Sequence, residues 1–401
     1  MIESVPYDRI RTSMDEFPLC DDCLIEYKEP LNRRYHGEAI CCGDCGPQMA
    51  IYEGQSKIDT DNPIGLGAEK LKEGKILAIK GIGGTHLVVD AYNDEAIKEL
   101  RNRLNRPNQA FAVMAKDLKS VQNYAEMSEK EIETITSNKR PIVILKKNDY
   151  YPFPDSLSPG LHNIGVMLPY SPMHYLLFDE GDIDTYVMTS ANIPGEPMMI
   201  KNEEIIGGVN DYSLVHNRKI LNRCDDSVIR FRNNELSFIR RSRGYTPEPY
   251  TINYDVNDSN VIALGPELDV TFSIAKDNIV YPSQHIGNTN KPKTLTFLKQ
   301  AIENMQRITK IDKFDVIACD MHPHFFTTRL AHEMAEKYDA KVLPVQHHHA
   351  HSIALANDHG LEEMIVIAAD GVGYGSDGTS WGGEILYTNV NSLLADRKSV
   401  V

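Results

Sequence analysis

Long apolar runs are absent from this sequence. No stretch of its 401 residues approaches the ~20 consecutive apolar residues that a membrane-spanning helix needs. The opening segment, MIESVPYDRIRTSMDEF, lacks the basic start and the apolar centre of a secretory signal. We therefore expect a cytoplasmic protein.

An excess of positive charge is also absent. The sequence holds 42 Lys and Arg residues against 57 Asp and Glu residues, which gives a formal net charge of -15. A chain this acidic gains no overall attraction to a polyphosphate, so broad nucleic-acid binding is disfavoured. A local basic pocket for one nucleotide is compatible with this balance.

Cysteines are too few for a disulfide framework. Seven occur, and five of them lie between Cys20 and Cys45, which indicates a metal site in a reducing compartment. Cys20-x2-Cys23 and Cys42-x2-Cys45 are separated by 18 residues, and two such pairs can close on one tetrahedral Zn(II) with no open coordination position. We predict a structural zinc ribbon over residues 1–55 that needs its metal to fold. The alternative is four unligated structural cysteines.

A mixed α/β region is expected after the cysteine cluster. Short apolar runs that predict strands alternate with a helical pattern that begins near Asn93 or Asp94. The expected strands are ILAIK, HLVVDAY, FAVMA, PIVIL and TYVMTS. The polar, turn-rich stretches GQSKIDTDNPIG and PEPYTINYDVNDSN are interpreted as a linker before this region and a boundary after it.

A third region begins near Val261. Its first part, NVIALGPEL and VTFSIAKDNIVYPS, predicts paired strands, and TLTFLKQAIENMQRI predicts a helix. FDVIACD, TTRLAHEMAEKY and KVLPVQ then predict a strand–helix–strand unit.

Cationic and polar side chains recur beside the expected strands of the second region. Lys80 stands before a glycine turn whose backbone N–H groups can approach phosphate. Arg103 and Arg106 end the predicted helix, and Arg140 precedes a strand. Further candidates are Thr189, Ser190, Asn192, Arg218, Arg223 and Ser227. Fixed Lys and Arg side chains can neutralise nucleotide oxygens, whereas the alternatives are a solvated helix face and simple turn caps.

A histidine run, HHHAH, gives the third region its strongest signal. On a helix, His347 and His351 lie one turn apart on the same face, which is a chelating spacing for a divalent metal. Asp370 follows the apolar run MIVIAAD, where a strand end can present a carboxylate. The alternative is a surface histidine run without a ligand. His322 is a candidate active-site group, and the alternative is that His322 and His324 are both structural polar residues.

The order of the motifs resembles that of the HypF family, carbamoyltransferases that help make the cyanide ligands of nickel-iron hydrogenase. VPYDRIRTSMDEFPLCDDCLIEYKEPLNRRYHGEAICCGDCGP resembles the family's second zinc finger. The next region resembles its adenylating domain, which is shared with threonylcarbamoyl-AMP synthases. The matching stretches there are KGIGGTHL, LRNRLNRP, FAVM, NKRPIVIL, GVMLPYSPMH, VMTSANIPGEP, LVHNRKILNRCDDSVIR and RRSRGYTPEP. The last region resembles the family's transfer domain, which is similar to threonylcarbamoyl transferases that act on tRNA.

The resemblance implies a multidomain α/β protein. A zinc ribbon over residues 1–55 would precede a YrdC-like carbamoyl-adenylating domain over 61–250, built on a twisted mixed sheet with helices. A Kae1-like transfer domain of the actin/Hsp70-type ATPase class would occupy 258–401. The family normally starts with an acylphosphatase-like domain and a first zinc finger and continues well beyond WGGE, so the resemblance also implies a partial sequence with exposed apolar strand edges.

The resemblance implies a two-step activity. Carbamoyl phosphate and Mg-ATP would give carbamoyl-adenylate, and the carbamoyl group would pass to a cysteine thiol of a HypE-type maturation protein. The cofactors would be a structural Zn(II) and a second divalent metal, Zn or Fe, in the transfer domain. The family's metal ligands map to His347, His351 and Asp370, and its stretch D-L-H-P maps to Asp320-Met321-His322-Pro323, which makes His322 a catalytic candidate beside Lys80 and Arg106.

The sequence departs from the family at several positions. The usual R-K-x-R-P-x-K-P-F-A-V-M has two lysines, where this chain has Leu104 and Gln109, followed by Ala110. The loss of two cations from an anion cleft predicts weaker binding of ATP or carbamoyl phosphate. Asn288 replaces an acid in S-Q-H-I-G-D, and Asp269-Val270 replaces the usual K-N after E-L.

Three other functions remain open at this stage. A small-molecule O-carbamoyltransferase would share the two later domains, although the cysteine pairs count against it. Threonylcarbamoyl transfer to tRNA would require threonine and is disfavoured by the acidic charge. A non-catalytic zinc-ribbon scaffold is suggested by Leu104, Gln109 and Asp269.

Overall fold

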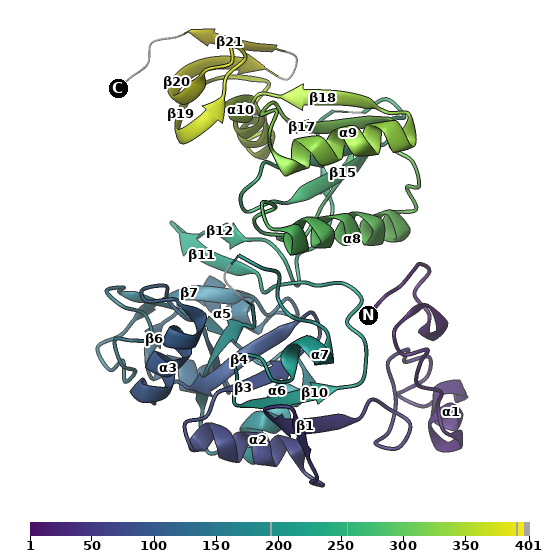
Figure 1. Ribbon diagram of the computed structural model, residues 1–401, viewed down its shortest axis with the longest axis vertical. Helices are drawn as coiled ribbons and strands as arrows, with labels where there is room; N and C mark the ends of the chain where they lie inside the picture. Colours follow the sequence, from purple (N-terminus) through teal and green to yellow (C-terminus); the bar gives the residue numbers. More distant parts are fainter. Residues whose placement is uncertain (193–194, 255, 390–391, 397–401) are drawn as a thin grey trace. The chain divides into compact units, whose positions relative to one another are not determined.

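The computed structural model describes residues 1–192, 195–254, 256–389 and 392–396. The chain forms two compact units, Met1–Tyr245 and Thr246–Val401 (Figure 1). Parts of the predicted motifs SANIPGEP and NYDVNDSN, and the last five residues of the predicted third domain, lie outside the described residues. The predicted domain limits 1–55, 61–250 and 258–401 stay predictions.

The first 48 residues of the first unit contain little regular structure. Arg9 is buried and ties three loop segments together. Its guanidinium donates hydrogen bonds to the carbonyl oxygens of Phe17 at 2.7 Å, Glu38 at 2.9 Å and Ile40 at 2.8 Å. The helices here are η1 (Arg9–Arg11) and α1 (Asp21–Lys28).

A twelve-stranded mixed sheet forms the centre of the first unit (Figure 1). Its strand order is β12-β11-β7-β8-β5-β9-β4-β3-β10-β1-β2, with β6 paired to β7. The strands are β1 (Met49–Glu53), β2 (Ser56–Ile58), β3 (Leu77–Lys80), β4 (Thr85–Asp90), β5 (Val113–Ala115), β6 (Ala125–Glu126), β7 (Ile142–Lys147), β8 (Asn163–Met167), β9 (Thr185–Ser190), β10 (Tyr212–His216), β11 (Val228–Arg232) and β12 (Glu235–Arg240).

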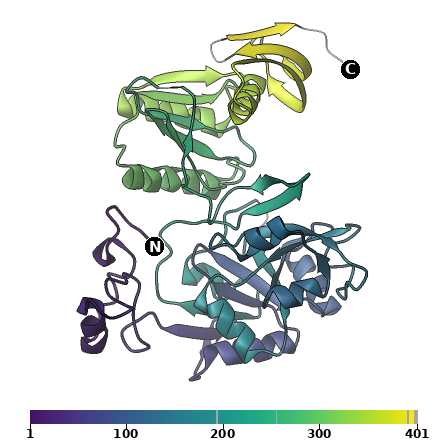
Figure 2. The same cartoon turned by 180° about the vertical axis from the view of Figure 1, so that it is seen from behind.

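Helices cover both faces of this sheet, which explains why its central strands are apolar on both sides (Figure 2). In β3, Leu77 and Ile79 pack with the helices α2 (Pro63–Lys72) and α6 (Pro172–Glu180). Ala78 packs on the opposite face with the remaining helices. These are α3 (Asp94–Leu104), α4 (Leu118–Gln122), α5 (Glu129–Thr136) and α7 (Asn202–Ile205).

Local capping sets the beginnings of two of these helices. Asn93 is the N-cap of α3 and accepts a hydrogen bond from the backbone N–H of Ala96, so the first of the two predicted caps is confirmed. The predicted linker 54–65 is wrong as a linker. It holds the hairpin turn after β1, strand β2 and the start of α2, where Asn62 caps and Pro63 occupies the first turn.

The second unit contains a six-stranded sheet and a three-stranded sheet. The strand orders are β13-β16-β15-β14-β17-β18 and β19-β20-β21, and the parallel pairing of β14, β17 and β18 fits the predicted strand–helix–strand unit. The strands are β13 (Tyr250–Thr251), β14 (Val261–Leu264), β15 (Phe272–Lys276), β16 (Ile279–Pro282), β17 (Val316–Asp320), β18 (Lys341–Val345), β19 (Glu363–Tyr374), β20 (Ser380–Asn389) and β21 (Ser392–Asp396).

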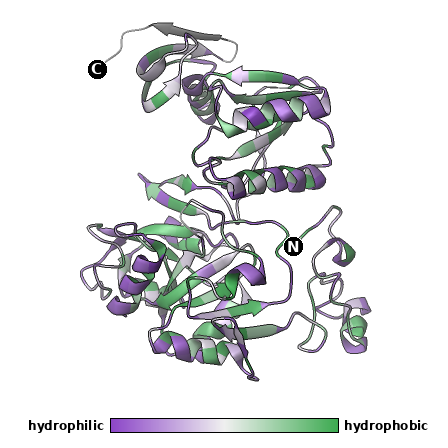
Figure 3. Ribbon diagram, viewed as in Figure 1, coloured by the Kyte–Doolittle hydropathy of each residue, from purple (hydrophilic) through white to green (hydrophobic). Residues whose placement is uncertain are grey.

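Three helices complete the second unit. They are α8 (Pro292–Thr309), α9 (Phe326–Tyr338) and α10 (His347–Asp358). Apolar residues of α8 and α9 share one core with the six-stranded sheet, and Figure 3 shows both helices as amphipathic, with polar outer faces. Among the described residues, no helix combines the length and apolar character that crossing a membrane requires.

Candidate functional site

The four predicted zinc ligands converge. Ligand atoms of Cys20, Cys23, Cys42 and Cys45 all lie within 4.8 Å of one another, and the sulfur of Cys42 is 3.7 Å from the sulfurs of both Cys20 and Cys45. Four thiols at this spacing match the donor set of a tetrahedral structural zinc site. Cys41, which breaks the spacing of the two pairs, stands outside the group.

The backbone favours thiolate in part of this group. Hydrogen bonds from the backbone of Cys20 and Cys42 lower the pKa of Cys45 to about 6. Burial and the neighbouring sulfurs raise the pKa of Cys23 to about 12. A bound cation would favour the thiolate form of all four cysteines, including Cys23 with its raised pKa, because thiolates are the form that binds metal.

Lys80 is the deepest cation of the first unit's candidate site. It ends β3 and is 3% exposed. Its ammonium donates hydrogen bonds to Asn202 Oδ1 at 2.7 Å and to the carbonyl oxygen of His216 at 2.9 Å. Burial, followed by the charge of Arg218, lowers the pKa of Lys80 to about 8. Burial, followed by the charges of Lys80 and then Arg218, lowers the pKa of His216 to about 4.

The glycine turn after Lys80 is dictated by packing. A Cβ on Gly84 would lie 1.9 Å from Cε of Met198, and a Cβ on Gly83 would lie 2.6 Å from the carbonyl oxygen of Cys224. Neither position has room for a larger residue. The turn therefore holds the end of β3, and Lys80 with it, against the loops that follow β9 and β10.

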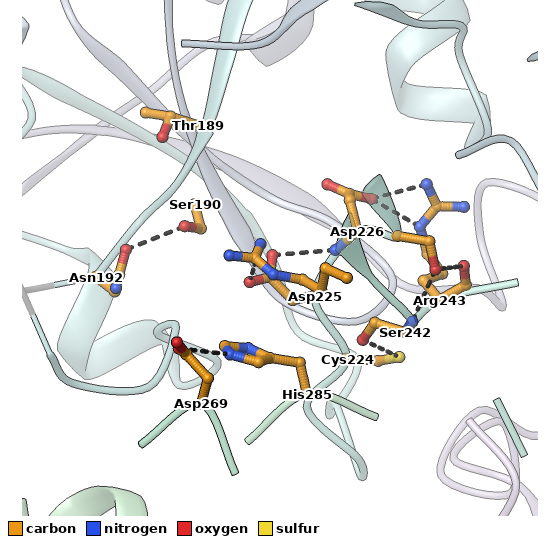
Figure 4. Close-up of polar contacts among 12 residues, drawn as sticks. Thr189, Ser190, Asn192, Cys224, Asp225, Asp226, Ser242, Arg243, Asp269 and His285 are labelled. Carbon is orange, nitrogen blue, oxygen red and sulfur yellow. Dashed lines mark hydrogen bonds and ion pairs between the residues drawn. The ribbon is translucent and has the colours of Figure 1, made fainter. Parts of the chain in front are cut away.

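Arg106 joins the polar loop after β9. Its two terminal nitrogens donate to Thr189 Oγ1 at 3.1 Å and to Asn192 Oδ1 at 3.0 Å. Ser190 donates to the same oxygen of Asn192 at 3.0 Å, a contact drawn in Figure 4. Four predicted site residues, which come from two separate motifs, therefore form one hydrogen-bonded group.

Three cations of the first unit, the buried Lys80 and the half-buried Arg106 and Arg218, contact neutral groups. Lys80 and Arg106 donate to neutral acceptors, and Arg218 lies 3.3 Å from the sulfur of Met1. Among the described residues, none of the three forms an ion pair. Burial lowers the pKa of both arginines. Removing unpaired charge from water is costly, fully for Lys80 and in part for the two half-buried arginines, so this arrangement is suited to a multiply charged anion.

Other predicted residues have different surroundings. Arg103 forms ion pairs with Glu99 and Asp211, both at 2.8 Å. Arg140 adopts a positive φ of 45° and lines a separate cavity of about 410 Å³ with Lys116 and Lys119. The nucleotide-binding roles predicted for Arg103 and Arg140 stay predictions.

Arg223 and Ser227 bind backbone groups. Arg223 Nε donates to the carbonyl oxygen of Met198 at 2.5 Å, which places it beside the glycine turn. Ser227 is fully buried; its hydroxyl donates to the carbonyl oxygen of Arg243 at 2.9 Å and accepts from the backbone N–H of Ser242 at 2.8 Å. Their predicted ligand roles also stay predictions.

The altered basic motif lies only partly at the surface. Leu104 is 1% exposed and packs in the core with Ile97 and Leu100. Gln109 and Ala110 are exposed. The side chain of Leu104 points into the core and not into a solvent-facing cleft. Its neutrality therefore takes no positive charge away from such a cleft in this chain.

A buried polar network was missed by the sequence reasoning. Asp226 accepts a hydrogen bond from Arg243 Nε at 2.8 Å (Figure 4). The other carboxylate oxygen of Asp226 lies 2.7 Å from His86 Nε2. Burial opposes ionisation of Asp226, but the charges of Arg243 and His86 outweigh it and hold its pKa well below the usual range. Arg243 also stacks 3.6 Å from the ring centroid of Tyr170. The four residues of this network all lie in motifs that the sequence analysis noted. Their contacts join residues far apart in the sequence, so the motifs alone could not predict them.

The histidine run of the second unit forms the start of α10, as predicted. Gln346 caps the helix by accepting from the backbone N–H of His349 at 2.9 Å. His347 and His351 lie one turn apart with their Nε2 atoms 3.2 Å from each other. Asp370 Oδ2 is 3.2 Å from His347 Nε2, and one ligand atom of each of the three lies within 4.8 Å of the others. Two imidazoles and a carboxylate fit a divalent transition metal.

Asp370 does not stand at a strand end. Strand β19 continues to Tyr374, and its register with β20 shifts between Ala369 and Gly373. This irregularity interrupts the strand pairing and directs Asp370 toward α10. Sequence reasoning missed three further groups around these ligands, namely Asp320, His348 and Glu384.

A cavity of about 1170 Å³ opens beside this group. Its lining includes His347, His351, Asp370 and the predicted catalytic residue His322. The ring of His322 stacks on Phe325 with centroids 4.0 Å apart and an interplanar angle of 13°. The structure thus brings all four polar side chains to the lining of a cavity that is large enough for a nucleotide-sized ligand.

Two of the noted departures are hydrogen-bonded to each other, and one of them, Asp269, lines this cavity. The side-chain oxygen of Asn288 accepts from the backbone N–H of Asp269 at 2.8 Å. Asp269 Oδ1 also lies 3.4 Å from His285 Nε2, as Figure 4 shows. An acid at position 288 would place two carboxylates side by side, and the neutral Asn288 avoids the repulsion between them.

Four sequence-family models match successive parts of the chain. Residues 19–52 match the HypF finger, and residues 69–242 match the Sua5, YciO and YrdC family described as telomere recombination. Residues 256–358 match the HypF Kae1-like domain, and residues 366–396 match the second subdomain of the carbamoyltransferase Kae1-like domain.

Named relatives and solved structures agree with these models. The chain is 48% identical to the probable carbamoyltransferase HypF of Methanocaldococcus jannaschii, over 92% of this chain and 55% of the relative. It is 40% identical to carbamoyltransferase HypF2 of Cupriavidus necator, over 96% of this chain and 50% of the relative. The crystal structure of T. kodakarensis HypF matches with a TM-score of 0.91 and 49% identity, over 97% of this chain and 51% of that chain.

A second solved structure carries ligands. Full-length HypF in a phosphate- and nucleotide-bound form matches with a TM-score of 0.91 and 40% identity, over 98% of this chain and 51% of that chain. The chain spans about half the length of the relatives it matches.

Proposed function

The chain belongs to the HypF family, and from that premise we propose that it carries out ATP-dependent carbamoyl transfer in the maturation of nickel-iron hydrogenase. In the first step, water cleaves carbamoyl phosphate into carbamate and inorganic phosphate, and an oxygen of the carbamate attacks the α-phosphorus of ATP. A new P–O bond forms to the carbamate, the bond to the β-phosphate breaks, and pyrophosphate leaves with its electron pair. The product is carbamoyl-adenylate.

The three cations of the first unit that form no ion pair among the described residues carry this proposal. Carbamate and a triphosphate bring several negative oxygens into one site, and Lys80, Arg106 and Arg218 offer fixed positive charge there. The hydrogen bonds among Arg106, Thr189 and Asn192 hold the guanidinium in place before a ligand arrives. A related full-length HypF has been solved in a phosphate- and nucleotide-bound form, which supports a nucleotide as a substrate of the family.

The second step is assigned to the second unit. His347, His351 and Asp370 would hold a divalent metal, which would supply a Lewis acid toward the mixed anhydride. His322 lines the cavity beside these ligands and would contact the bound adenylate. The acceptor would be a cysteine thiol of a HypE-type protein. The thiol sulfur would bond to the carbamoyl carbon, and AMP would leave.

The cysteine group has a structural role in this proposal. Four thiol donors leave no open position on zinc, so no step passes through that metal. Their reduced state fits the cytoplasm, the compartment that we propose for the protein.

Exchange of labelled pyrophosphate into ATP tests the first step on this 401-residue chain. We expect exchange that depends on carbamoyl phosphate or on directly supplied ammonium carbamate. Lys80→Ala should abolish it, and Lys98→Ala should not, because Lys98 is exposed and pairs with Asp94 at the surface. Folded, zinc-loaded protein that shows no exchange with either carbamate source would contradict the proposal and favour a non-catalytic scaffold.

A further inference from the structure

Asp320 lies directly behind the histidine that begins α10. It ends β17 and its side chain is 6% exposed. Oδ2 lies 2.9 Å from Nδ1 of His347, and Oδ1 accepts the backbone N–H of His322 at 2.8 Å. Both carboxylate oxygens are therefore occupied, each by a different donor.

We propose that Asp320 is a positioning residue that prepares His347 to bind the metal. Asp320 can only accept hydrogen bonds when ionised, so the proton of neutral His347 resides on Nδ1. The lone pair then resides on Nε2, the atom that faces Asp370 Oδ2 and His351 Nε2 at 3.2 Å each. A hydrogen bond to the distal ring nitrogen fixes both the tautomer and the ring plane of a metal-binding histidine.

The hydrogen bond to His322 gives Asp320 a second task. This hydrogen bond holds the Asp320 carboxylate at a fixed angle. Its donor is a backbone N–H of the loop after β17, which has less rotational freedom than a side-chain donor. The same loop presents His322 to the cavity. Asp320 thereby links the orientation of the metal ligand to the position of the residue proposed to contact the adenylate.

Asp370 is supported differently. His348 is 1% exposed and lies 3.3 Å from Asp370 Oδ2 and 3.1 Å from Glu384 Oε2. These contacts are at ion-pair distance but lack hydrogen-bond alignment. A Cβ on Gly373 would lie 2.8 Å from His348 Nε2, so the packing is tight there. We therefore assign the orienting role to Asp320 alone.

Replacement of Asp320 by asparagine is a sharp test. An amide has one acceptor oxygen, so Asp320→Asn can satisfy either His347 or the N–H of His322, whereas the other donor would face an NH2 group. The shape of the side chain is otherwise kept. Asp312→Asn is the control, because Asp312 is an exposed aspartate of the same unit.

The experiment uses the whole chain with its cysteine site already loaded with zinc, titrated with Co(II). We expect Asp320→Asn to weaken Co(II) binding about 10–100-fold and to change the visible d–d spectrum, while Asp312→Asn matches the parent chain. The inference rests on the proposed metal role of His347. Loss of binding in His347→Ala, together with parent-like affinity in Asp320→Asn, would overturn the positioning role alone. Parent-like affinity in His347→Ala would overturn both.

A second measurement needs no variant. Nitrogen chemical shifts of the His347 ring in metal-free protein, taken at alkaline pH where the ring is neutral, report its tautomer. We expect the proton on Nδ1. A proton on Nε2 would overturn the inference even if Asp320→Asn failed to fold.

Discussion

Arg106 and Asn192, 86 positions apart in the sequence, meet through a hydrogen bond of 3.0 Å between a guanidinium nitrogen and the side-chain oxygen. Thr189 and Ser190 complete the group. Arg103, three positions earlier and also cationic, forms ion pairs with Glu99 and Asp211 instead. Arg103 and Arg106 lie at the end of the same helix but differ in their partners. The charge of Arg103 is neutralised by two carboxylates, whereas Arg106 contacts neutral acceptors.

The contrast between the two arginines predicts different effects on adenylate formation. Arg106→Gln should lower the rate of pyrophosphate exchange by about 100–1000-fold, the usual cost of losing a donor to developing charge. Arg103→Gln should change it little, because its charge is already neutralised by Glu99 and Asp211. Exchange rates of both variants, with circular dichroism to verify folding, decide the matter. Equal losses in the two variants would contradict this assignment.

The sequence was informative where a feature is local or repeated in a motif. The cap at Asn93, the helical spacing of His347 and His351, and the two cysteine pairs depend on a few neighbouring residues. Asp320, which ends β17 and contacts His347 at the start of α10, could not be found that way. Contacts between side chains far apart in the sequence depend on how whole helices and strands pack. In the sequence, each member of such a pair is only an isolated polar residue.

The state of Leu104 could not be predicted from motif comparison either. A lysine restored at that position would enter the core of the first unit, since Leu104 is 1% exposed. Leu104→Lys should therefore lower the free energy of unfolding by roughly 3–5 kcal/mol, the cost of an uncompensated buried charge. Gln109→Lys is the matched control and should cost less than about 0.5 kcal/mol, because residue 109 is exposed.

Urea unfolding followed by circular dichroism measures these two changes. The chain has one tryptophan, Trp381, which lies in the second unit and is 5% exposed. Its emission should keep its midpoint in Leu104→Lys while the circular dichroism signal of the first unit moves to lower urea. A variant as stable as the parent chain would show that the side chain at position 104 escapes the core.

The pH dependence of anion binding should follow Lys80. Its pKa is lowered to about 8 by burial and the charge of Arg218, so the ammonium loses its proton as pH rises through that value. ATP affinity, measured by calorimetry, should therefore fall between pH 7 and 9 in the parent chain. Lys80→Ala should bind weakly throughout and lack this step.

Stability should respond to the same group with the opposite sign. The folded pKa of Lys80 lies below its unfolded value of ~10.4, so the unfolded chain binds more protons between about pH 8 and 10. The contribution of Lys80 to the free energy of unfolding then rises with pH over that window. The difference between the parent chain and Lys80→Ala isolates it, and a contribution that falls over this window would contradict the assigned shift.

Asp226 should govern the acid stability of the first unit. Its carboxylate is 5% exposed and pairs with Arg243 and His86. Because its folded pKa lies below the unfolded value of ~3.9, the stabilisation is complete above that value and is lost as pH falls through the folded pKa. Asp226→Asn should cost roughly 3–5 kcal/mol at neutral pH and flatten this acid limb. Asp225→Asn, whose partner Arg240 is more exposed, should cost less.

Removal of zinc should unfold the cysteine region before the large sheet. The described residues between 13 and 48 bury few apolar side chains, among them Met14 and Cys23, so metal ligation is the main source of local order there. A strong chelator should therefore raise amide hydrogen exchange in α1 and in the loop of residues 41–46, while β3 and β4 stay protected. Cys42→Ser should lose the zinc, and Cys41→Ser should retain it, although the two residues are neighbours in the chain. Only Cys42 belongs to the converging group, so equal zinc contents in the two variants would show that the ligand set is not the one the geometry indicates.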